Sequence, residues 1–276
     1  MDPTDTIVIR PEHGLASLQL GELWRYRELL GFLAWRDIRV RYKQSVLGVL
    51  WVLITPVVTM AIFSVIFGRV ARIPSDGAPY PIFCFVGLLP WLFFSQSLQR
   101  ATASVVAEHN LLTKVYFPRL IVPVAATLAP LVELGIASSV LVAMMVWYGL
   151  VPSLHAFVLA PLCVAWAWLL AIGAGTLLSA ANVHYRDVGQ MIPFLVQVWM
   201  YASPVVYPVS MFPETWRFVL GLNPMVGVIE GLRFAVLGHG SLPVASLAVS
   251  AGVSLLLLVT GVLSFKRMER TFADVV

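Results

Sequence analysis

The chain has 276 residues, of which 59% are hydrophobic and 12% are charged, and its net charge at pH 7 is +4. Soluble domains contain about 45–50% apolar and about 25% charged residues, so a soluble fold of this length could not hide so much apolar surface. The composition therefore excludes a soluble protein and predicts an all-α integral membrane protein, with about 20 apolar residues in each span.

The N-terminal segment precedes the first apolar stretch. It has no apolar core that ends in a small-residue cleavage site, so we expect the first span, not a signal peptide, to direct insertion. Residues 1–21 are interpreted as a cytoplasmic tail, and residues 22–43 as a helix that is too charged to cross a membrane.

The predicted helix at 22–43 has apolar residues at helical spacing, namely Tyr26, Leu29, Leu30 and Leu33. That pattern fits a helix in the cytoplasmic interface, with Trp24 and Trp35 at the depth of the lipid headgroups. Because Phe32 and Trp35 fall outside the stripe, a soluble helix packed against the bundle is the alternative.

Six apolar stretches follow, and only one ionisable side chain, Glu133, lies well inside any of them. Each stretch is long enough to cross the hydrocarbon core. The six transmembrane helices are expected at about 46–68, 78–100, 119–149, 156–183, 188–207 and 242–265.

The distribution of basic residues predicts the topology. With six spans, fourteen of the 18 Lys and Arg residues fall on the side that carries both termini. Because cytoplasmic segments are enriched in Lys and Arg, this places both termini in the cytoplasm and the protein in the inner (plasma) membrane. The same placement indicates a membrane surface as the partner of the basic residues and argues against nucleic acid. Residues 22–270 form one transmembrane domain, followed by a tail at 271–276.

Residues 210–238 contain several charges and are too short for two spans, which predicts two short extracytoplasmic helices between spans 5 and 6. The second has a clear start and end: Asn223 as N-cap, Pro224 at the first helical position and Gly238 after the last turn. Backbone that turns within a membrane must be shielded by protein or line a water-filled space. We therefore expect this segment to cover the mouth of a pore.

The chemistry that the sequence lacks narrows the function. It has no G-x-x-x-x-G-K-[ST] phosphate loop, so we expect no ATP site of its own. The five histidines are scattered, and Cys84 and Cys163 lie in apolar stretches as small buried hydrophobes, so no catalytic or metal site is predicted. For Glu133 two interpretations stay open: a polar group in a conduit or partner of a basic group, and a structural acid hydrogen-bonded between helices.

Basic and aromatic side chains supply the remaining candidate sites. The basic stretch at 36–43 is either an anchor on anionic lipid or a phosphate-binding mouth, because arginine forks fit phosphate oxygens. Aromatic side chains inside the spans are either ordinary packing and interface anchors or a conduit on which sugar rings stack.

Five motifs occur in order along the chain: RVRYKQSVLGVLW at 39–51 followed by Thr55-Pro56, NLLTKVYFPR at 110–119, NVHYRD at 182–187, SPVVYP at 203–208 and LNP at 222–224. As a set they resemble the ABC-2-type permeases that export lipid-linked O-antigen, teichoic acid or capsule. The resemblance covers about residues 25 to 270.

The resemblance implies six spans, an N-terminal interface helix and short gating helices between spans 5 and 6. It also implies a homodimer that works with two separate ATPase subunits, which bind the ATP and Mg²⁺ that this chain does not. The connection at 108–117 would be the main coupling helix, and residues 182–189 would be a second cytoplasmic contact. The expected coupling residues are Glu108, His109, Asn110, Leu111, Leu112, Lys114, Tyr116, Arg186 and Asp187.

The expected mechanism follows from these assignments. A polyprenyl pyrophosphate head meets a basic mouth formed by Arg39, Arg41, Lys43 and Arg119. The glycan passes a conduit formed by five aromatic residues and Glu133, namely Trp91, Phe94, Glu133, Phe194, Trp199 and Tyr201. An exit gate is formed by Tyr207, Asn223, Pro224, Glu230 and Arg233. O-antigen is the expected cargo. The alternatives are teichoic acid, capsule, a small lipid or drug, and, from another class, a membrane enzyme of glycan assembly.

Overall fold

The computed structural model describes residues 20–43, 47–115, 117–152, 154–238 and 244–269, and every regular element in these ranges is helical. Five helical segments within them are long and apolar enough to cross a membrane. They are α3 with η2 (Leu50–Phe63 and Ser64–Val70), α4 (Tyr80–Ala107), α6 with α7 (Ile121–Ala126 and Leu128–Tyr148), α8 (Ala156–His184) and α12 (Val244–Met268). The predicted all-α membrane fold is confirmed.

The predicted fifth span differs from the structure. Helix α9 (Asp187–Tyr201) has 15 residues, and the chain leaves helical geometry after Tyr201. Pro204 and Pro208 account for this early end, because proline lacks an N–H donor and disfavours the α conformation of the residue before it. A sixth long apolar segment exists only if α10 (Glu214–Gly221) and α11 (Pro224–Leu237), which meet at an angle of 106°, are counted together.

Helix α4 lies at the centre of the bundle. In its most apolar window 83% of the residues are buried, against 6% for the segment Leu50–Val70. Small residues bring the neighbouring helices close: a Cβ at Gly173 of α8 would stand 2.4 Å from the backbone of Leu258 in α12, and one at Gly175 would stand 2.6 Å from Ala101 in α4. Close backbone approach of this kind drives helix packing in lipid, where apolar burial alone supplies little.

The predicted interface helix is two helices, α1 (Leu20–Arg25) and α2 (Arg27–Lys43). Its apolar stripe faces protein, because Leu33 is 2% exposed and packs in a cluster with Phe117 and Ile121. Phe32 and Trp35, which the stripe leaves out, are 64% and 62% exposed. The helix therefore has two apolar faces, one against the bundle and one available to lipid, so the two interpretations of the sequence describe its two sides.

The predicted third span is continuous in length but interrupted at Thr127. Pro130 explains the interruption, because its ring clashes with the carbonyl four residues earlier and it offers no N–H. The Thr127 hydroxyl donates to the Val124 carbonyl (2.7 Å) and accepts a hydrogen bond from the indole N–H of Trp168 (2.8 Å). The polar groups at the break are thus paired within the bundle.

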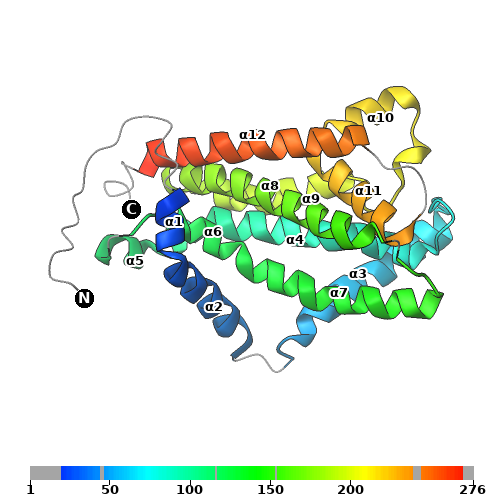
Figure 1. Ribbon diagram of the computed structural model, residues 1–276, viewed down its shortest axis with the longest axis horizontal. Coiled ribbons are helices and arrows are strands. Elements are labelled where there is room, and N and C mark those ends of the chain that lie inside the picture. The colour runs from blue at the N-terminus through cyan, green and yellow to red at the C-terminus, as the bar shows by residue number, and fades with distance from the viewer. Residues whose placement is uncertain (1–19, 44–46, 116, 153, 239–243, 270–276) are drawn as a thin grey trace.

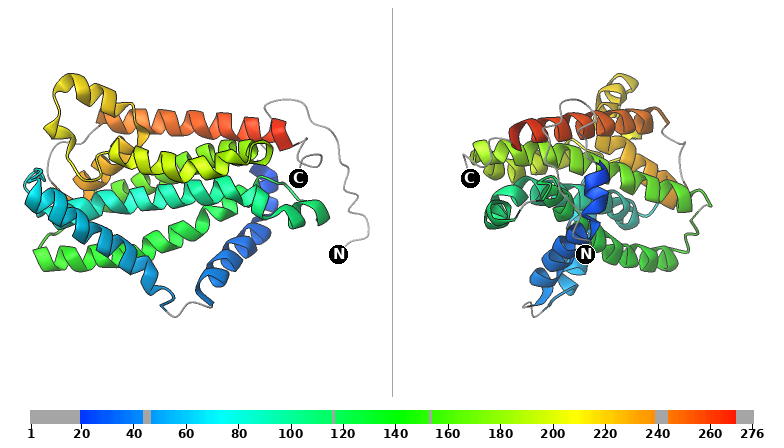
Figure 2. Two further views of the ribbon diagram at one scale, coloured as in Figure 1. Left: turned by 180° about the vertical axis from the view of Figure 1, so that it is seen from behind. Right: turned by 60° about the vertical axis from the view of Figure 1, so that its left-hand side comes forward.

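The remaining short helices mark the two ends of the molecule. Helix α5 (His109–Lys114) lies with α1 at one end of the bundle, and α10 lies at the other, after the 3₁₀ turn η3 (Val209–Met211) (Figure 1). The view from behind shows the same separation (Figure 2). Any function that joins these regions must therefore act along the length of the bundle.

Candidate functional site

The connection between α4 and α6 contains the predicted coupling residues. The side chain of Glu108 accepts a hydrogen bond from Arg36 of α2 (3.0 Å), so this connection is tied to the interface helix. Leu111 and Leu112 pack inward against the Leu33 cluster, whereas Asn110 and Lys114 are exposed. His109 opens helix α5, and Tyr116 lies outside the described residues. Among the described residues of this connection, Asn110 and Lys114 are therefore the most accessible members of the predicted set.

The turn between α8 and α9 contains the second predicted contact, where Arg186 and Asp187 are exposed. Asn182 fixes this turn, because its amide donates to the Thr102 carbonyl of α4 (3.2 Å) and its oxygen accepts from the Gly189 N–H (2.8 Å). A Cβ at position 189 would stand 2.8 Å from that oxygen, so a larger residue there would displace the Asn182 side chain. Both connections are thus anchored to the central helix or to its end.

The glutamate of the third span joins three helices. Glu133 of α7 accepts hydrogen bonds from Arg41 (2.8 Å) and Tyr42 (3.0 Å) of α2 and from Arg100 of α4 (2.8 and 3.0 Å). Burial raises the pKa of Tyr42, which keeps the phenol protonated and donating. We call these four residues the acid cluster. Its contacts favour the interpretation of Glu133 as a partner of basic groups, and they also connect helices as the structural interpretation requires.

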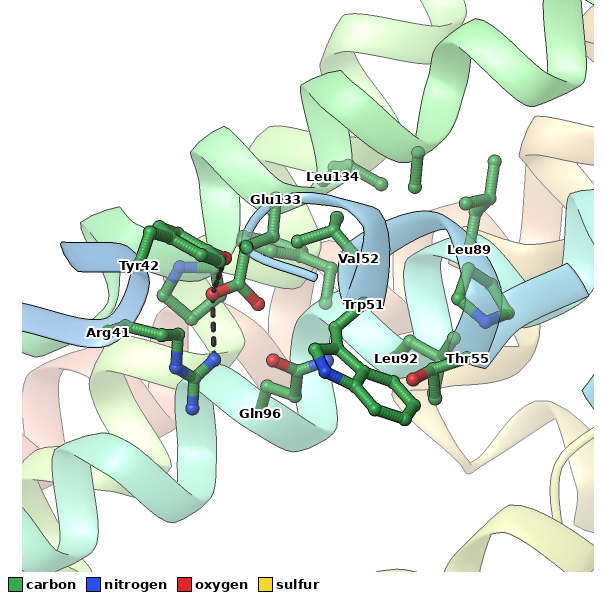
Figure 3. Close-up of a pocket in the computed structure, with 15 residues that line it drawn as sticks. Arg41, Tyr42, Trp51, Val52, Thr55, Leu89, Leu92, Gln96, Glu133 and Leu134 are labelled. Atoms are coloured by element: carbon green, nitrogen blue, oxygen red, sulfur yellow. Dashed lines mark hydrogen bonds and ion pairs between the residues drawn. The ribbon is translucent and has the colours of Figure 1, made fainter. Parts of the chain in front are cut away.

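A cavity of about 310 Å³ opens beside the acid cluster, between α3, α4 and α7 (Figure 3). Arg41, Tyr42, Gln96 and Glu133 form its polar end. The rest of its wall is mostly apolar and comes from Gly48, Trp51, Val52, Thr55, Pro56, Leu89, Leu92, Phe93, Pro130, Leu134 and Ala137. A second hollow of about 510 Å³, the α2–α4 groove, lies between the interface helix and α4 and shares Arg41 with the cavity.

The predicted pyrophosphate mouth is only partly assembled. Of its four residues, Arg41 lines the cavity, whereas Arg39 and Lys43 are exposed on α2 and do not line it. The guanidinium of Arg119 donates to the Glu269 carbonyl just after α12, and Arg119 does not line the cavity. Arg100, a basic residue outside the predicted group, binds Glu133 instead.

The predicted aromatic conduit divides into two sets. Trp91 is 2% exposed and Phe94 is fully buried, and both rings contact Trp199 with centroids 6.0 and 5.0 Å away. They therefore belong to the core of the chain and line no passage in this arrangement. Phe194 and Tyr201 are 66% and 54% exposed, so the outer face of α9 presents them to lipid or to another protein.

The predicted gate residues come together around α11. The side chain of Asn223 caps this helix by accepting from the Met225 N–H (3.0 Å), Pro224 occupies the first helical position, and Gly238 ends the helix with φ +69°. The predicted start and end of the second short helix are confirmed. Asn223 also accepts from the Trp199 indole N–H (3.0 Å), which ties α11 to α9.

A buried arginine holds the segment before α10 and α11. Arg233 is 5% exposed, pairs with Glu230 (2.9 Å) and donates to the carbonyls of Val205 (2.7 Å) and Tyr207 (3.2 Å). Its guanidinium carbon also lies 3.7 Å from the centre of the Phe83 ring on α4. We call these five residues the gate cluster. It supplies donors for carbonyls that the broken helix leaves without helical partners.

Comparison with known proteins identifies the family to which the chain is similar. The profile of the family described as ABC-2 type transporter matches residues 28–237. The chain is 32% identical over 257 residues to the O-antigen export system permease protein RfbA of Myxococcus xanthus, covering 92% of this chain and 97% of that protein. It is 26% identical over 248 residues to the protein of the same name from Klebsiella pneumoniae, covering 90% and 95%. It is 26% identical over 208 residues to the polysialic acid transport protein KpsM of Escherichia coli, covering 73% and 78%.

Proposed function

This chain belongs to the ABC-2 type transporter family, and from that premise we propose that it is the permease subunit of an ATP-driven exporter of lipid-linked O-antigen polysaccharide. The similarity to an O-antigen export permease along 92% of the chain is the observation that carries the proposal. A match of that extent includes the interface helix, the cavity, the coupling connections and the gate cluster together.

The energy source in this proposal is a separate ABC ATPase, present in two copies with a homodimer of this chain. ATP and Mg²⁺ are bound by that partner. The sequence has no phosphate loop, and among the described residues no group of three or more His, Cys, Asp or Glu side chains could hold a metal ion. The permease would act by changing shape when the ATPase changes shape.

The two cytoplasmic connections are suited to transmit that change. A rigid-body shift reaches the spans only if the docking elements are firmly tied to them. Glu108 is held by Arg36, and the turn at Arg186 is held by Asn182. Movement of either connection would therefore move α4, around which the bundle is packed.

Deletion and complementation test the proposed function. Removing the gene from its host should abolish surface O-antigen and leave lipid-linked glycan on the cytoplasmic side, and the wild-type gene should restore export. Lys114→Glu and Arg186→Glu should restore it poorly, because both are exposed on the coupling connections. Arg69→Glu, an exposed change on η2, is the matched control and should restore export fully. Normal surface O-antigen after deletion would refute the proposal.

Capsule is the second candidate cargo. The observation that favours it is the similarity to the polysialic acid transport protein over 73% of the chain. The same deletion strain separates the two, because a capsule exporter would leave O-antigen at the surface and retain the capsular polymer inside.

A further inference from the structure

The connection between α9 and α10 (residues 202–213) contains only the short turn η3 as regular structure, and side chains from neighbouring helices hold its backbone. Arg233 of α11 donates to the carbonyls of Val205 (2.7 Å) and Tyr207 (3.2 Å). The carbonyl between them, that of Val206, accepts a hydrogen bond from the hydroxyl of Tyr80 at the start of α4 (2.7 Å). Three successive carbonyls are therefore satisfied by side chains of two different helices.

The ring of Tyr80 also contacts the end of the first apolar segment. A Cβ at Gly68 of η2 would stand 2.8 Å from this ring, so the ring lies directly on the backbone of a π-helix. π-Helices are rare and occur mostly at functional sites. No residue of η2 is buried, so the bundle holds this end of the segment only lightly. One tyrosine thus contacts both η2 and the connection between α9 and α10.

A second hydrogen bond joins the same two regions. The hydroxyl of Ser210 in the connection donates to the carboxylate of Asp76 (2.7 Å), which lies in the loop between η2 and α4. Arg72 and Asp76 of this loop have φ of 52° and 49°, a region that strains residues with a side chain, above all a long one. The loop is therefore held in a strained conformation at the end of the bundle where α10 lies (Figure 1).

The connection is held unequally on its two sides. Toward α11 it is held by the guanidinium of Arg233, which is 5% exposed and pairs with Glu230. Toward η2 it is held by the half-buried Tyr80 and by the exposed hydrogen bond between Ser210 and Asp76. Water competes for exposed hydrogen bonds, whereas a buried donor that loses its acceptor bears the full cost of desolvation. If the connection leaves one neighbour, it therefore leaves η2 and stays with α11.

We propose that Tyr80 is a positioning residue that closes a seam between the first apolar segment and the connection between α9 and α10. The seam consists of the contacts of Tyr80 with Gly68 and Val206 and of the hydrogen bond between Asp76 and Ser210. When its hydrogen bonds break, the connection moves away from η2 together with α11. That this opening lets the exported polymer leave rests on the proposed function, whereas the opening itself does not.

Labelling of a buried thiol measures the opening. Val206→Cys places a thiol at a position that is 5% exposed, and the full-length chain in lipid nanodiscs is treated with a membrane-impermeant maleimide. Tyr80→Phe keeps the ring on Gly68 but removes the hydrogen bond, so it should speed labelling about fivefold, which corresponds to about 1 kcal/mol. Tyr207→Phe is the matched control, because it removes a hydroxyl that donates to the Tyr201 carbonyl (3.0 Å) without crossing the seam. It should leave the labelling rate unchanged.

The native Cys163 shows whether the effect is local. Its thiol is fully buried on α8, and peptide mapping measures its labelling separately from labelling at position 206. Opening of the seam leaves the labelling of Cys163 unchanged, whereas a general loss of stability speeds the labelling of both thiols. Equal acceleration at both thiols, or equal effects of Tyr80→Phe and Tyr207→Phe, would overturn the proposal.

Further substitutions test each contact of the seam. Gly68→Ala displaces the Tyr80 ring and should speed labelling as Tyr80→Phe does, and the double variant should be no faster than the faster single variant because both act on one contact. Asp76→Asn keeps an acceptor for Ser210 and should label at the parent rate, whereas Asp76→Ala should label about threefold faster. Parent rates in both Gly68→Ala and Asp76→Ala would contradict the seam.

Bridging the seam tests whether its opening serves transport. Asp76→Cys and Ser210→Cys are joined by a short, reducible thiol linker in proteoliposomes that also contain the ATPase partner. Transport of lipid-linked glycan should stop and should return on reduction. The pair Ser210→Cys and Arg217→Cys, which lies on one side of the seam, is the control and should transport glycan when bridged.

The two proposals fail in different ways in this assay. Normal transport across a bridged seam would overturn the role of the seam and leave the proposed function intact. Absence of transport before bridging would count against the proposed function, and the labelling rates would still decide whether the seam opens.

Discussion

The acid cluster and the gate cluster are built from the same kinds of side chain and differ in what surrounds them. In the acid cluster one carboxylate faces two arginines beside a cavity, and the Arg41 side chain is 49% exposed. In the gate cluster one arginine faces one carboxylate, two backbone carbonyls and an aromatic ring, and it is 5% exposed. The acid cluster has one more arginine than carboxylate and lies beside a cavity, whereas the arginine of the gate cluster is surrounded by its partners.

This difference shows why a buried ion pair does not by itself identify a function. Buried pairs are weak evidence for stability, since their desolvation offsets their attraction, but removing one partner is costly. The gate cluster satisfies carbonyls that an irregular segment exposes, so its role is to hold that segment. The acid cluster connects α2, α4 and α7, and its Arg41 side chain is half-exposed beside a cavity. The following predictions separate the two roles.

The largest effect is expected at the gate cluster. Arg233→Ala leaves Glu230 and the carbonyls of Val205 and Tyr207 without their donor, and it should destabilise the protein by about 3–5 kcal/mol. Thermal unfolding in detergent measures this, with Arg69→Ala as an exposed control. A wild-type unfolding temperature in Arg233→Ala would show that the gate cluster is not a structural clamp.

A smaller loss is expected at the acid cluster. Glu133→Ala leaves Arg41 and Arg100 without their carboxylate and should cost about 1–3 kcal/mol. Thermal unfolding in detergent measures this, and the loss should be smaller than that of Arg233→Ala because the Arg41 side chain is 49% exposed. A loss as large as that of Arg233→Ala would remove the distinction between the clusters.

The ion pair between the interface helix and the coupling connection should matter for transport more than for stability. Arg36 and Glu108 are partly exposed, so a double-mutant cycle should give a coupling energy below about 1 kcal/mol. Export in the complementation assay should nevertheless fall in Arg36→Ala and Glu108→Ala, because the connection is no longer tied to α2. Full export in both single variants would contradict this role.

The smallest effect is expected at the contact between α9 and the start of α11. Trp199→Phe keeps an aromatic ring against Phe94 but removes the hydrogen bond to Asn223, which should cost about 0.5–1.5 kcal/mol. The same thermal assay measures it, and Trp216→Phe, exposed on α10, is the control. A loss of stability larger than that of Glu133→Ala would show that α9 stabilises α11 more than its contacts indicate.

Local signals in the sequence predicted local features well. Asn223, Pro224 and Gly238 mark the ends of α11 because capping depends on residues within a few positions of each other. The apolar lengths of the spans similarly predicted an all-helical membrane protein. The predicted fifth span is too long, because the apolar stretch continues past Tyr201 whereas helix α9 ends there.

Contacts between distant residues could not be predicted in the same way. Glu133 and Arg41 are 92 positions apart, and no periodicity connects them. A span that is apolar on every side gives no sign of which face is buried, so Trp91 and Phe94 could be assigned to a conduit although they lie in the core. The sequence places Arg100 among the basic residues on the cytoplasmic side. Its ion pair with Glu133 follows only from the packing of α4 against α7.

Transport in proteoliposomes is the most direct test of whether this chain is a permease driven by a separate ABC ATPase. Vesicles would contain this chain alone or with its ABC ATPase partner, loaded with lipid-linked O-antigen, and translocation would be followed as accessibility of the glycan to an added glycosidase. We expect translocation only when both proteins and ATP are present, with no ATP hydrolysis by the chain alone. Hydrolysis by the isolated chain, or translocation driven by an ion gradient without the partner, would contradict the proposed function.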